Sequence, residues 1–220
     1  AWVEVLKGVD FDARHGDLTM VMGPSGSGKS TLIAALSGLL KPEEGRVDAL
    51  EVDDLWKLST GRIDKFRLDN CGFIFQGFNL FPALTALQQV TTVLKFQGLT
   101  PDQARKRATT ALEEVGLGHR LHQRPAALSG GEKQRVAIAR SLAFDPEVLL
   151  MDEPFAALDA LTRRRMQEEL QALWEEARFT MLFVTHSIEE ALVVGNRILL
   201  LSPHPGRVRA EINAHPFDLH

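Results

Sequence analysis

Short apolar runs bounded by polar or turn residues recur along this chain, and helical patterns lie between them. The runs have the length and continuous hydrophobicity of parallel strands that are buried on both faces. They predict strands at residues 18–22, 70–76, 147–151, 180–184 and 197–201. The helical patterns between them predict helices at residues 30–38, 162–177 and 187–194. Strands that alternate with helices in this way predict an α/β protein with a mostly parallel sheet.

Two further parts of the chain have a different pattern. Apolar and polar residues alternate at positions 3–6, 9–11 and 45–52, and this alternation predicts a small antiparallel β layer. Residues 77–144 are mainly helical in pattern, and Thr100 followed by Pro101 is a typical helix start. That helix should run to about residue 115. We therefore expect a sheet lobe made of residues 1–76 and 145–220, with a helical lobe inserted at residues 77–144.

Composition excludes several classes of protein. The chain has 220 residues, of which 45% are hydrophobic and 25% are charged, and its net charge is −4. This balance gives no sign of a surface for nucleic acid. Cys71 is the only cysteine, so no internal disulfide can form, and a reducing compartment fits. No apolar run approaches the ~20 residues needed to cross a bilayer, and no signal peptide is visible. We expect neither a nucleic-acid partner nor direct membrane insertion.

The most informative motif is the segment GPSGSGKS at residues 23–30. It lies between a predicted strand and a predicted helix, and it fits the phosphate-loop pattern. Its glycines let backbone N–H groups converge on phosphate oxygens, and the helix N-terminus adds further donors. Lys29 would contact the β- and γ-phosphates, and the Ser30 hydroxyl would ligate Mg²⁺. The expected nucleotide contacts are Gly23, Ser25, Gly26, Ser27, Gly28, Lys29, Ser30 and Thr31.

Two carboxylates follow the apolar strand at residues 147–151. Asp152 is suited to hold Mg²⁺ through water, and Glu153 is suited to act as general base toward an attacking water. Such a pair alone is typical of a solvated strand end. Beside a phosphate loop, the catalytic interpretation is favoured because α/β proteins place ligand chemistry at strand ends.

Gln76 and His186 end two more of the predicted strands. Gln76 is a candidate to ligate Mg²⁺ or orient water, and His186 is a candidate to contact the γ-phosphate. Each is weak evidence alone, because an isolated polar residue at a strand end is usually structural. Ser187 and Glu190 have capping-box spacing, which explains their own presence but not that of His186.

A second glycine-rich helix start lies about a hundred residues after the first. Ser129 and Glu132 have capping-box spacing, and Gly130 and Gly131 lie between them. A capped helix start that carries two glycines still presents open N–H groups to an anion. One chain thus contains two anion-binding motifs.

The segment LSGGEKQR at residues 128–135 resembles the signature motif of ATP-binding cassette ATPases. The order of the motifs is also that of this family: phosphate loop, Gln76, signature, Asp152 with Glu153, the segment ALD at residues 157–159, and His186. The resemblance covers nearly the whole chain. It implies a RecA-like P-loop NTPase lobe, a helical lobe that carries the signature, and a head-to-tail homodimer.

In such a dimer, ATP on the phosphate loop of one subunit is sealed by the signature residues of the second subunit, and Asp159 lies at the interface. The resemblance implies a Mg²⁺-dependent ATPase that uses ATP to energise transport through a transmembrane permease. Such a subunit is cytoplasmic and peripheral on the inner face of the cell membrane. Family members usually stack an aromatic residue, often Tyr, on adenine. This chain has no Tyr, so Trp2 is the candidate.

The two halves of the chain resemble different branches of the family. Residues 58–67 and 73–85 resemble the lipoprotein-release and macrolide or glycolipid exporter ATPases. Residues 152–163 and 202–208 resemble the nitrate, sulfonate and taurine importer ATPases. The halves indicate opposite transport directions, so an unusual branch and a fusion of two relatives both stay open.

The apolar residues after Gln76 have two possible roles. Phe78, Leu80, Phe81 and Leu84 would either contact a helix of the permease or pack between the lobes. The function of the chain also has three rival interpretations. They are a non-transport cassette ATPase, a non-catalytic interaction module, and an engineered or fused domain with impaired nucleotide binding.

Overall fold

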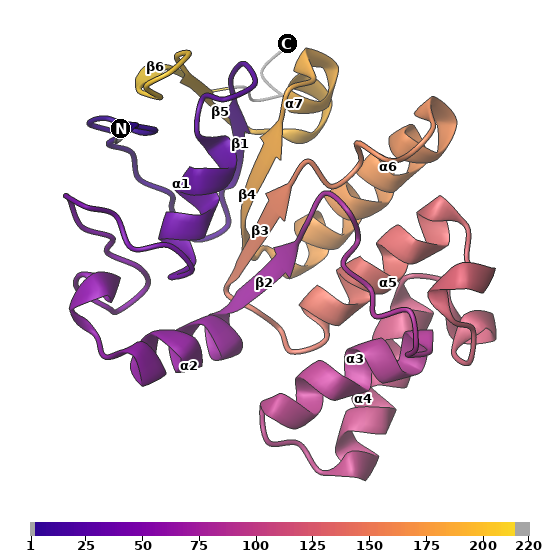
Figure 1. Cartoon of the computed structure of the whole chain (residues 1–220). Coiled ribbons are helices and arrows are strands. Elements are labelled where there is room, and N and C mark those ends of the chain that lie inside the picture. The colour runs from indigo at the N-terminus through magenta and orange to yellow at the C-terminus, as the bar shows by residue number, and fades with distance from the viewer. Residues whose placement is uncertain (1–2, 214–220) are drawn as a thin grey trace.

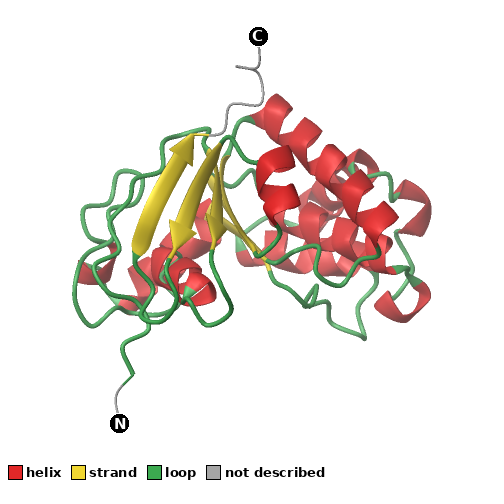
Figure 2. Ribbon diagram, turned by 90° about the horizontal axis from the view of Figure 1, so that it is seen from above, coloured by secondary structure: helices red, strands yellow, loops and turns green. Residues whose placement is uncertain are grey.

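A computed structural model describes residues 3–213 of the protein. Its centre is a six-stranded sheet in the order β2-β3-β4-β1-β5-β6, with helices on both faces (Figures 1 and 2). The five strands β1 to β5 are parallel, and β6 is antiparallel to β5. The strands are β1 (Leu18–Met22), β2 (Cys71–Ile74), β3 (Val148–Asp152), β4 (Thr180–Thr185), β5 (Arg197–Leu201) and β6 (Val208–Asn213).

The register of the parallel strands brings their carboxyl ends to one edge. Ile74 lies beside Met151, and Asp152 lies beside Val184. Met22, the last residue of β1, pairs with Thr185, the last residue of β4. The loops that follow β2, β3, β4 and β1 therefore lie next to one another in that order. Ligands of open α/β sheets bind at this edge, outside the carboxyl ends of the strands.

Side chains of the parallel strands β1 to β5 alternate between two buried layers, which explains the continuous apolar runs. On one face, Leu182 and Val184 pack with Ile33 of α1 (Lys29–Leu36). On the opposite face, Met181 and Phe183 pack against α6 (Ala160–Ala177) and α7 (Ile188–Val194). The sheet is thus the middle layer of three.

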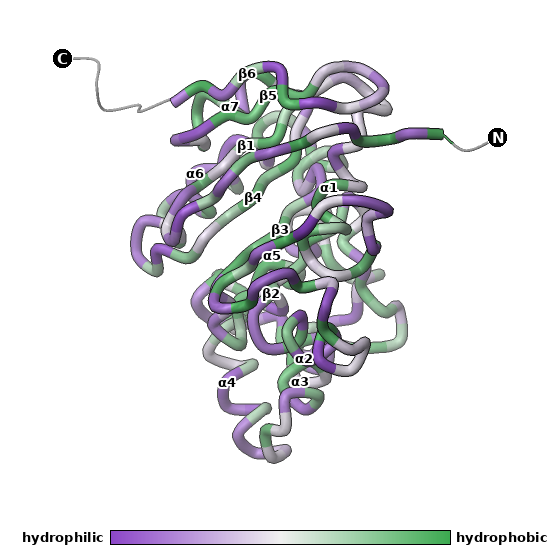
Figure 3. The backbone as a smooth tube through the Cα atoms, turned by 90° about the vertical axis from the view of Figure 1, so that its left-hand side faces the viewer, coloured by the Kyte–Doolittle hydropathy of each residue, from purple (hydrophilic) through white to green (hydrophobic). Residues whose placement is uncertain are grey.

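Three helices form a second lobe with a core of their own. They are α3 (Ala86–Phe96), α4 (Pro101–Glu114) and α5 (Gly130–Leu142). The expected start of α4 is confirmed: Thr100 caps the helix reciprocally with Gln103, and Pro101 is its first residue. The largely hydrophilic α4 lies at the end of the molecule far from β6 (Figure 3). Helix α5 also places Ala137 and Ile138 in the core under the sheet, so it belongs to both cores.

The predicted α/β class with a mostly parallel sheet is confirmed, but the expected strands at residues 3–6, 9–11 and 45–52 are wrong. Leu6 makes only an isolated bridge with Gly206, and Ala49 makes one with Val52. A strand forms only where a neighbouring strand pairs with it over several residues. These segments have no such neighbour among the described residues, and their apolar side chains pack in clusters that include helix residues. The antiparallel part of the sheet is β6, which sequence analysis did not predict.

Sequence analysis also missed helix α2 (Thr60–Asn70). Ile63 and Phe66 are its buried residues, so its apolar periodicity is weak. The remaining elements are short 3-10 helices: η1 (Leu55–Lys57), η2 (Gly118–Arg120) and η3 (Pro125–Ala127). No helix among residues 3–213 is both long and apolar enough to span a membrane.

The buried aromatic pair of Phe183 in β4 and Phe155 predicts a large loss of stability on truncation. The rings of Phe183 and Phe155 lie 5.6 Å apart, and both side chains are almost fully buried. We expect Phe183→Ala to lower the free energy of unfolding by about 3–5 kcal/mol, because it leaves a cavity. Denaturant unfolding measures this change. Phe81→Ala is the control, because Phe81 is 62% exposed, and its effect should stay within about 0.5 kcal/mol. Equal effects of the two substitutions would contradict the described core.

Candidate functional site

The loop between β1 and α1 has the backbone that anion binding needs. Gly28 precedes the helix with φ +84°, and Gly26 has φ +78°. No side chain caps α1 within the described chain, so the N–H groups of its first turn stay available. A helix start of this kind attracts negative charge through these donors and its dipole.

Close packing explains two glycines of this loop. A Cβ on Gly28 would lie 2.6 Å from Leu6 Cδ2, and a Cβ on Gly23 would lie 2.6 Å from Ser27 Oγ. Ser27 is fully buried, and within the described residues its hydroxyl has no hydrogen-bond partner. A buried hydroxyl without a partner is rare, so this oxygen is free for a ligand.

Lys29 is held inside the loop. Its Nζ donates hydrogen bonds to the carbonyl oxygens of Gly23 at 2.8 Å and Pro24 at 3.0 Å, and the residue is only 7% exposed. These neutral acceptors satisfy the buried ammonium group. A phosphate oxygen is a stronger acceptor for it, because charge-assisted hydrogen bonds are about twice as strong as neutral ones. The loop therefore fits a triphosphate.

Three of the predicted catalytic residues meet at the carboxyl edge of the sheet. Glu153 Oε2 accepts a hydrogen bond from Gln76 Nε2 at 3.2 Å, and Glu153 Oε1 lies 3.2 Å from His186 Nδ1. These residues follow β3, β2 and β4, which are neighbours in the sheet. A carboxylate, an imidazole and an amide in contact are suited to orient and deprotonate a water molecule.

The backbone at Glu153 is unusual. Its φ is +45°, in the left-handed region that residues besides glycine rarely adopt. Its N–H donates to the carbonyl oxygen of Val184 at 3.0 Å, which fixes the turn onto the end of β4. Strained backbone of this kind concentrates at functional sites.

The residues expected to hold Mg²⁺ include a single carboxylate, that of Asp152. Within the described chain, no group of three or more His, Cys, Asp and Glu side chains is arranged to hold a metal. Asp152 is half-buried at the end of β3, and Ser30 and Gln76 are exposed. Magnesium sites in nucleotide-binding proteins typically use one or two carboxylates together with phosphate oxygens and water. The three side chains fit such a shared site.

The second glycine-rich helix start belongs to the opposite side of the molecule. Ser129 and Glu132 form the expected capping box, in which Ser129 N–H donates to Glu132 Oε2 at 2.8 Å. This hydrogen bond is the main cause that lowers the pKa of Glu132. Ser129 and Gly130 are exposed, and Gly131 is half-buried. Helix α5 and helix α1 lie on opposite faces of the sheet (Figure 1), so the two anion-binding motifs belong to different layers.

Asp159 begins α6 on the surface. Its Oδ1 accepts a hydrogen bond from the N–H of Thr162 at 3.0 Å, and this contact lowers the pKa of the exposed carboxyl. Asp159 is exposed and therefore available for contact with another molecule. Trp2, the expected adenine-stacking residue, lies outside the described residues.

The segment after Gln76 is partly packed and partly open. Phe78 and Leu80 pack against the cores, whereas Phe81 is exposed and Leu84 is half-buried. Packing between the lobes therefore explains Phe78 and Leu80. Exposed Phe81 remains suited to contact a partner.

Arg140 of α5, which sequence analysis missed, holds this segment in place. Its guanidinium donates to the carbonyl oxygens of Asn79 at 2.6 Å and Phe78 at 3.2 Å. Phe78 and Asn79 both have positive φ, at 61° and 45°, so the contact stabilises a strained turn. Burial lowers the pKa of Arg140.

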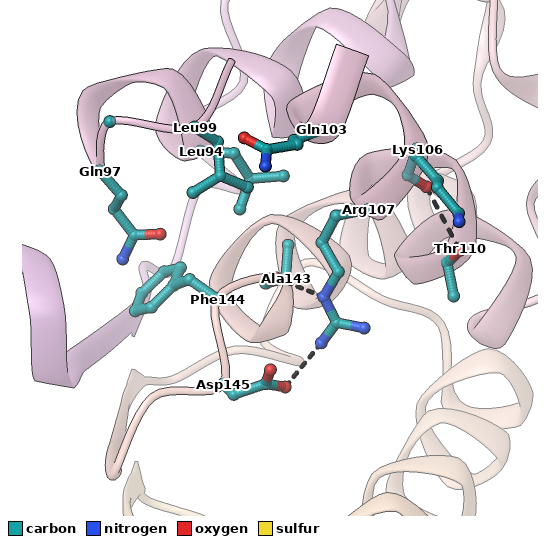
Figure 4. A pocket seen from close by; sticks show the side chains of 11 residues that line it. Leu94, Gln97, Leu99, Gln103, Lys106, Arg107, Thr110, Ala143, Phe144 and Asp145 are labelled. Carbon is teal, nitrogen blue, oxygen red and sulfur yellow. Dashed lines mark hydrogen bonds and ion pairs between the residues drawn. The ribbon is translucent and has the colours of Figure 1, made fainter. Parts of the chain in front are cut away.

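A groove of about 640 Å³ lies between the end of α3, α4 and residues 143–145 (Figure 4). Arg107 donates from Nε to the carbonyl oxygen of Ala143 at 2.8 Å and from Nη2 to Asp145 Oδ1 at 2.6 Å. Since its arginine is already paired, we assign no chemistry to this groove.

The capping box expected at residues 187–190 is only half formed. Ser187 Oγ accepts from the N–H of Glu190, but Ser187 N–H donates to Thr185 Oγ1 at 3.0 Å instead of to Glu190. The Glu190 carboxylate points into the protein and binds Thr185 and Gln167. The donors Thr185 and Gln167 therefore fix the orientation of the Glu190 carboxylate. The capping-box spacing of Ser187 and Glu190 does not predict these two contacts.

Comparison with known proteins adds an independent line of evidence. Residues 6–156 match the family model described as ABC transporter. The chain is 41% identical over 211 residues to the taurine import ATP-binding protein TauB of Rhizobium johnstonii, across 96% of this chain and 77% of TauB. It is 41% identical over 215 residues to the aliphatic sulfonates import ATP-binding protein SsuB of Bacillus licheniformis, across 98% of this chain and 78% of SsuB.

A solved structure is similar over nearly its whole length. It is the dimeric structure of a post-hydrolysis state of the ATP-binding cassette MJ0796 bound to ADP and Pi. The TM-score is 0.84 at 39% sequence identity, and the match covers 97% of this chain and 92% of that chain.

The contact of Arg140 with the strained turn gives a testable prediction. We expect Arg140→Gln to speed amide hydrogen exchange of residues 77–84 by about tenfold, because the turn loses the donors that hold its two carbonyls. Hydrogen–deuterium exchange with mass spectrometry measures this. Arg105→Gln, on the exposed side of α4, is the matched control. Unchanged exchange in the Arg140 variant would show that the turn is held by different contacts.

Proposed function

The chain belongs to the ABC transporter family, and on that basis we propose how its own residues bind and hydrolyse ATP. Family membership makes it an ATP-binding and ATP-hydrolysing subunit that energises transport. The observation that carries the proposed site is the contact of Glu153 with both Gln76 and His186, next to the phosphate loop.

In this proposal the phosphate loop binds the triphosphate. The N–H groups of residues 26–31 and the Lys29 ammonium contact the phosphates, and Lys29 exchanges its carbonyl partners for phosphate oxygens. Ser30, Gln76 and Asp152 hold Mg²⁺, which neutralises phosphate charge when bound. Trp2, outside the described residues, stays the predicted stacking partner of the adenine.

Hydrolysis then uses the strand-end residues. Glu153 accepts a proton from the attacking water, the water oxygen bonds to the γ-phosphorus, and the bond to the oxygen of ADP breaks. Gln76 orients the water. His186 contacts the γ-phosphate and keeps Glu153 in place.

The two anion-binding motifs support a head-to-tail dimer. The phosphate loop of the same chain leaves the second motif unused, because α1 and α5 lie on opposite faces of the sheet. This motif consists of Ser129, Gly130, Gly131 and Glu132. We propose that they close over ATP held by a second copy, with Asp159 at the interface. The exposure of Ser129 and Gly130 supports this arrangement, as does the dimeric state named for the similar MJ0796 cassette.

The membrane partner is proposed to be a permease, contacted through residues 77–85 with exposed Phe81. This would place the subunit at the inner face of the cell membrane. TauB and SsuB are import proteins and match both halves of this chain, which supports import of a small polar solute. The exporter resemblance of the first half stays a prediction. The division of the chain into a sheet lobe (residues 1–76 and 145–220) and a helical lobe (residues 77–144) also stays a prediction.

Phosphate release from Mg-ATP tests the catalytic roles. Glu153→Gln should lower kcat by at least about 100-fold, because the amide cannot accept the proton of the water. Lys29→Ala should abolish measurable nucleotide binding. Glu147→Gln removes an exposed carboxylate at the opposite end of β3 and should hydrolyse ATP normally. A Glu153→Gln protein as fast as the wild type would refute the assignment of the general base.

Size-exclusion chromatography with light scattering tests the shared site. Glu153→Gln should be monomeric without nucleotide and dimeric with ATP, because it retains ATP without hydrolysing it. Adding Gly130→Asp should keep it monomeric with ATP. Aspartate is favourable at a helix start, and its Cβ would lie 3.3 Å from Leu158 Cδ2, so only the end of this side chain has to shift, whereas the charge of the aspartate repels phosphate. A dimer of the double variant, or no dimer of the single variant, would contradict the proposal.

A further inference from the structure

A buried carboxylate lies beneath the turn that carries His186. Glu190, in the first turn of α7, is only 8% exposed. Its Oε2 accepts a hydrogen bond from the Thr185 hydroxyl, and its Oε1 accepts one from Gln167 Nε2 at 3.0 Å. Thr185 and Gln167 are buried as well. A carboxylate removed from water needs such donors, so this arrangement fixes all three side chains.

These hydrogen bonds hold the chain on both sides of His186. The Thr185 hydroxyl donates to Glu190 and accepts from Ser187 N–H at 3.0 Å. Ser187 Oγ in turn accepts from Glu190 N–H at 3.3 Å. The His186 side chain is 67% exposed, and it contacts Glu153 at 3.2 Å. The position of His186 is therefore set by its two neighbours, and both are bound to Glu190.

The same carboxylate also faces the turn that precedes α6. Arg163 Nε lies 3.9 Å from Glu190 Oε1. The Arg163 guanidinium also donates to the carbonyl oxygens of Leu158 at 3.0 Å and Phe155 at 3.3 Å. These carbonyls belong to the turn that ends at Asp159. Glu190 thus connects the turn of His186 with the turn of Asp159 through two side chains.

We propose that Glu190 is a positioning residue for ATP hydrolysis, which holds His186 against Glu153 and couples that contact to the turn of Asp159. The inference rests on the functions proposed above for His186 and Asp159. Glu190 itself touches neither Glu153 nor His186 by its side chain in the described contacts. It acts through Thr185 and Arg163.

Steady-state hydrolysis of Mg-ATP by the full chain tests this proposal. Glu190→Ala should lower kcat on the order of 100-fold, because small misplacements of catalytic groups have effects of that size. The KM for ATP should stay within about twofold, since the phosphate loop is untouched. Glu190→Gln keeps the volume but loses an acceptor, and we expect about a tenfold loss. Glu189→Ala is the matched control: it removes the exposed neighbouring carboxylate and should behave as the wild type.

A double-mutant comparison separates positioning from general damage. If Glu190 acts through His186, the variant with both His186→Ala and Glu190→Ala should be no slower than His186→Ala alone. Multiplied losses would overturn the proposal. Thermal unfolding of each variant checks that it is folded. If Glu190→Ala does not fold, Glu190→Gln replaces it in this comparison.

Crystal structures of the Glu190 variants decide the positioning role independently of kinetics. We expect the 3.2 Å contact between His186 Nδ1 and Glu153 to be lost. A variant that keeps this contact would overturn the inference, whatever its rate. If His186→Ala hydrolyses ATP normally while the turn moves in the Glu190 variant, the positioning stands. In that case the catalytic role proposed for His186 fails.

Discussion

Hydrogen bonding between parallel strands in one register is the constraint on which the site depends. The sheet aligns β2, β3, β4 and β1 so that their last residues lie side by side. Residues separated by more than a hundred positions in the chain are thereby brought close together, as Gln76 and His186 are on either side of Glu153. A slip of one residue in β3 would turn its side chains to the opposite face and break both contacts. Burial of both faces of the sheet makes such a slip costly.

Glu153 is the point where this regular framework becomes irregular. The strand ends, φ turns positive, and the backbone N–H crosses to Val184 of the neighbouring strand. A β3 that continued regularly would carry the carboxylate away from the edge. The strained turn instead presents it between an amide and an imidazole. The free energy that this conformation costs is offset by the surrounding packing, in which Phe155 is almost fully buried directly after the turn.

The sequence places Gln76, Glu153 and His186 at strand ends correctly because each of these signals is local. A phosphate loop needs only a strand, glycines and a helix start, and each strand end marks its own catalytic residue. The elements that were missed depend on distant partners. Residues 45–52 look like a strand, but their apolar side chains pack against η1 and α2 and find no neighbouring strand among the described residues. Arg140 and Glu190 look like ordinary helix residues, and their roles come from carbonyls and hydroxyls that the fold places beside them. Tertiary contacts of this kind leave no pattern in the spacing of residues.

Helix α5 joins the helical lobe to the rest of the molecule by both apolar and polar contacts, and this has a mechanical consequence. Arg135 of α5 binds Glu169 of α6 through two hydrogen bonds at 2.5 and 2.9 Å, and Arg140 binds the turn after Gln76. Ala137 and Ile138 of α5 also lie in the core under the sheet, whereas the buried apolar residues of α3 and α4 lie in the core of the helical lobe. Charge-assisted hydrogen bonds at partly exposed positions can break and re-form with water at small net cost, whereas opening an apolar core exposes its whole surface. Displacement of the helical lobe as a unit would keep the core of that lobe intact, but it would separate Ala137 and Ile138 from the core under the sheet, so α5 resists it. Since α5 begins directly after Ser129 and carries Arg140, such a displacement moves the signature residues and the segment after Gln76 together.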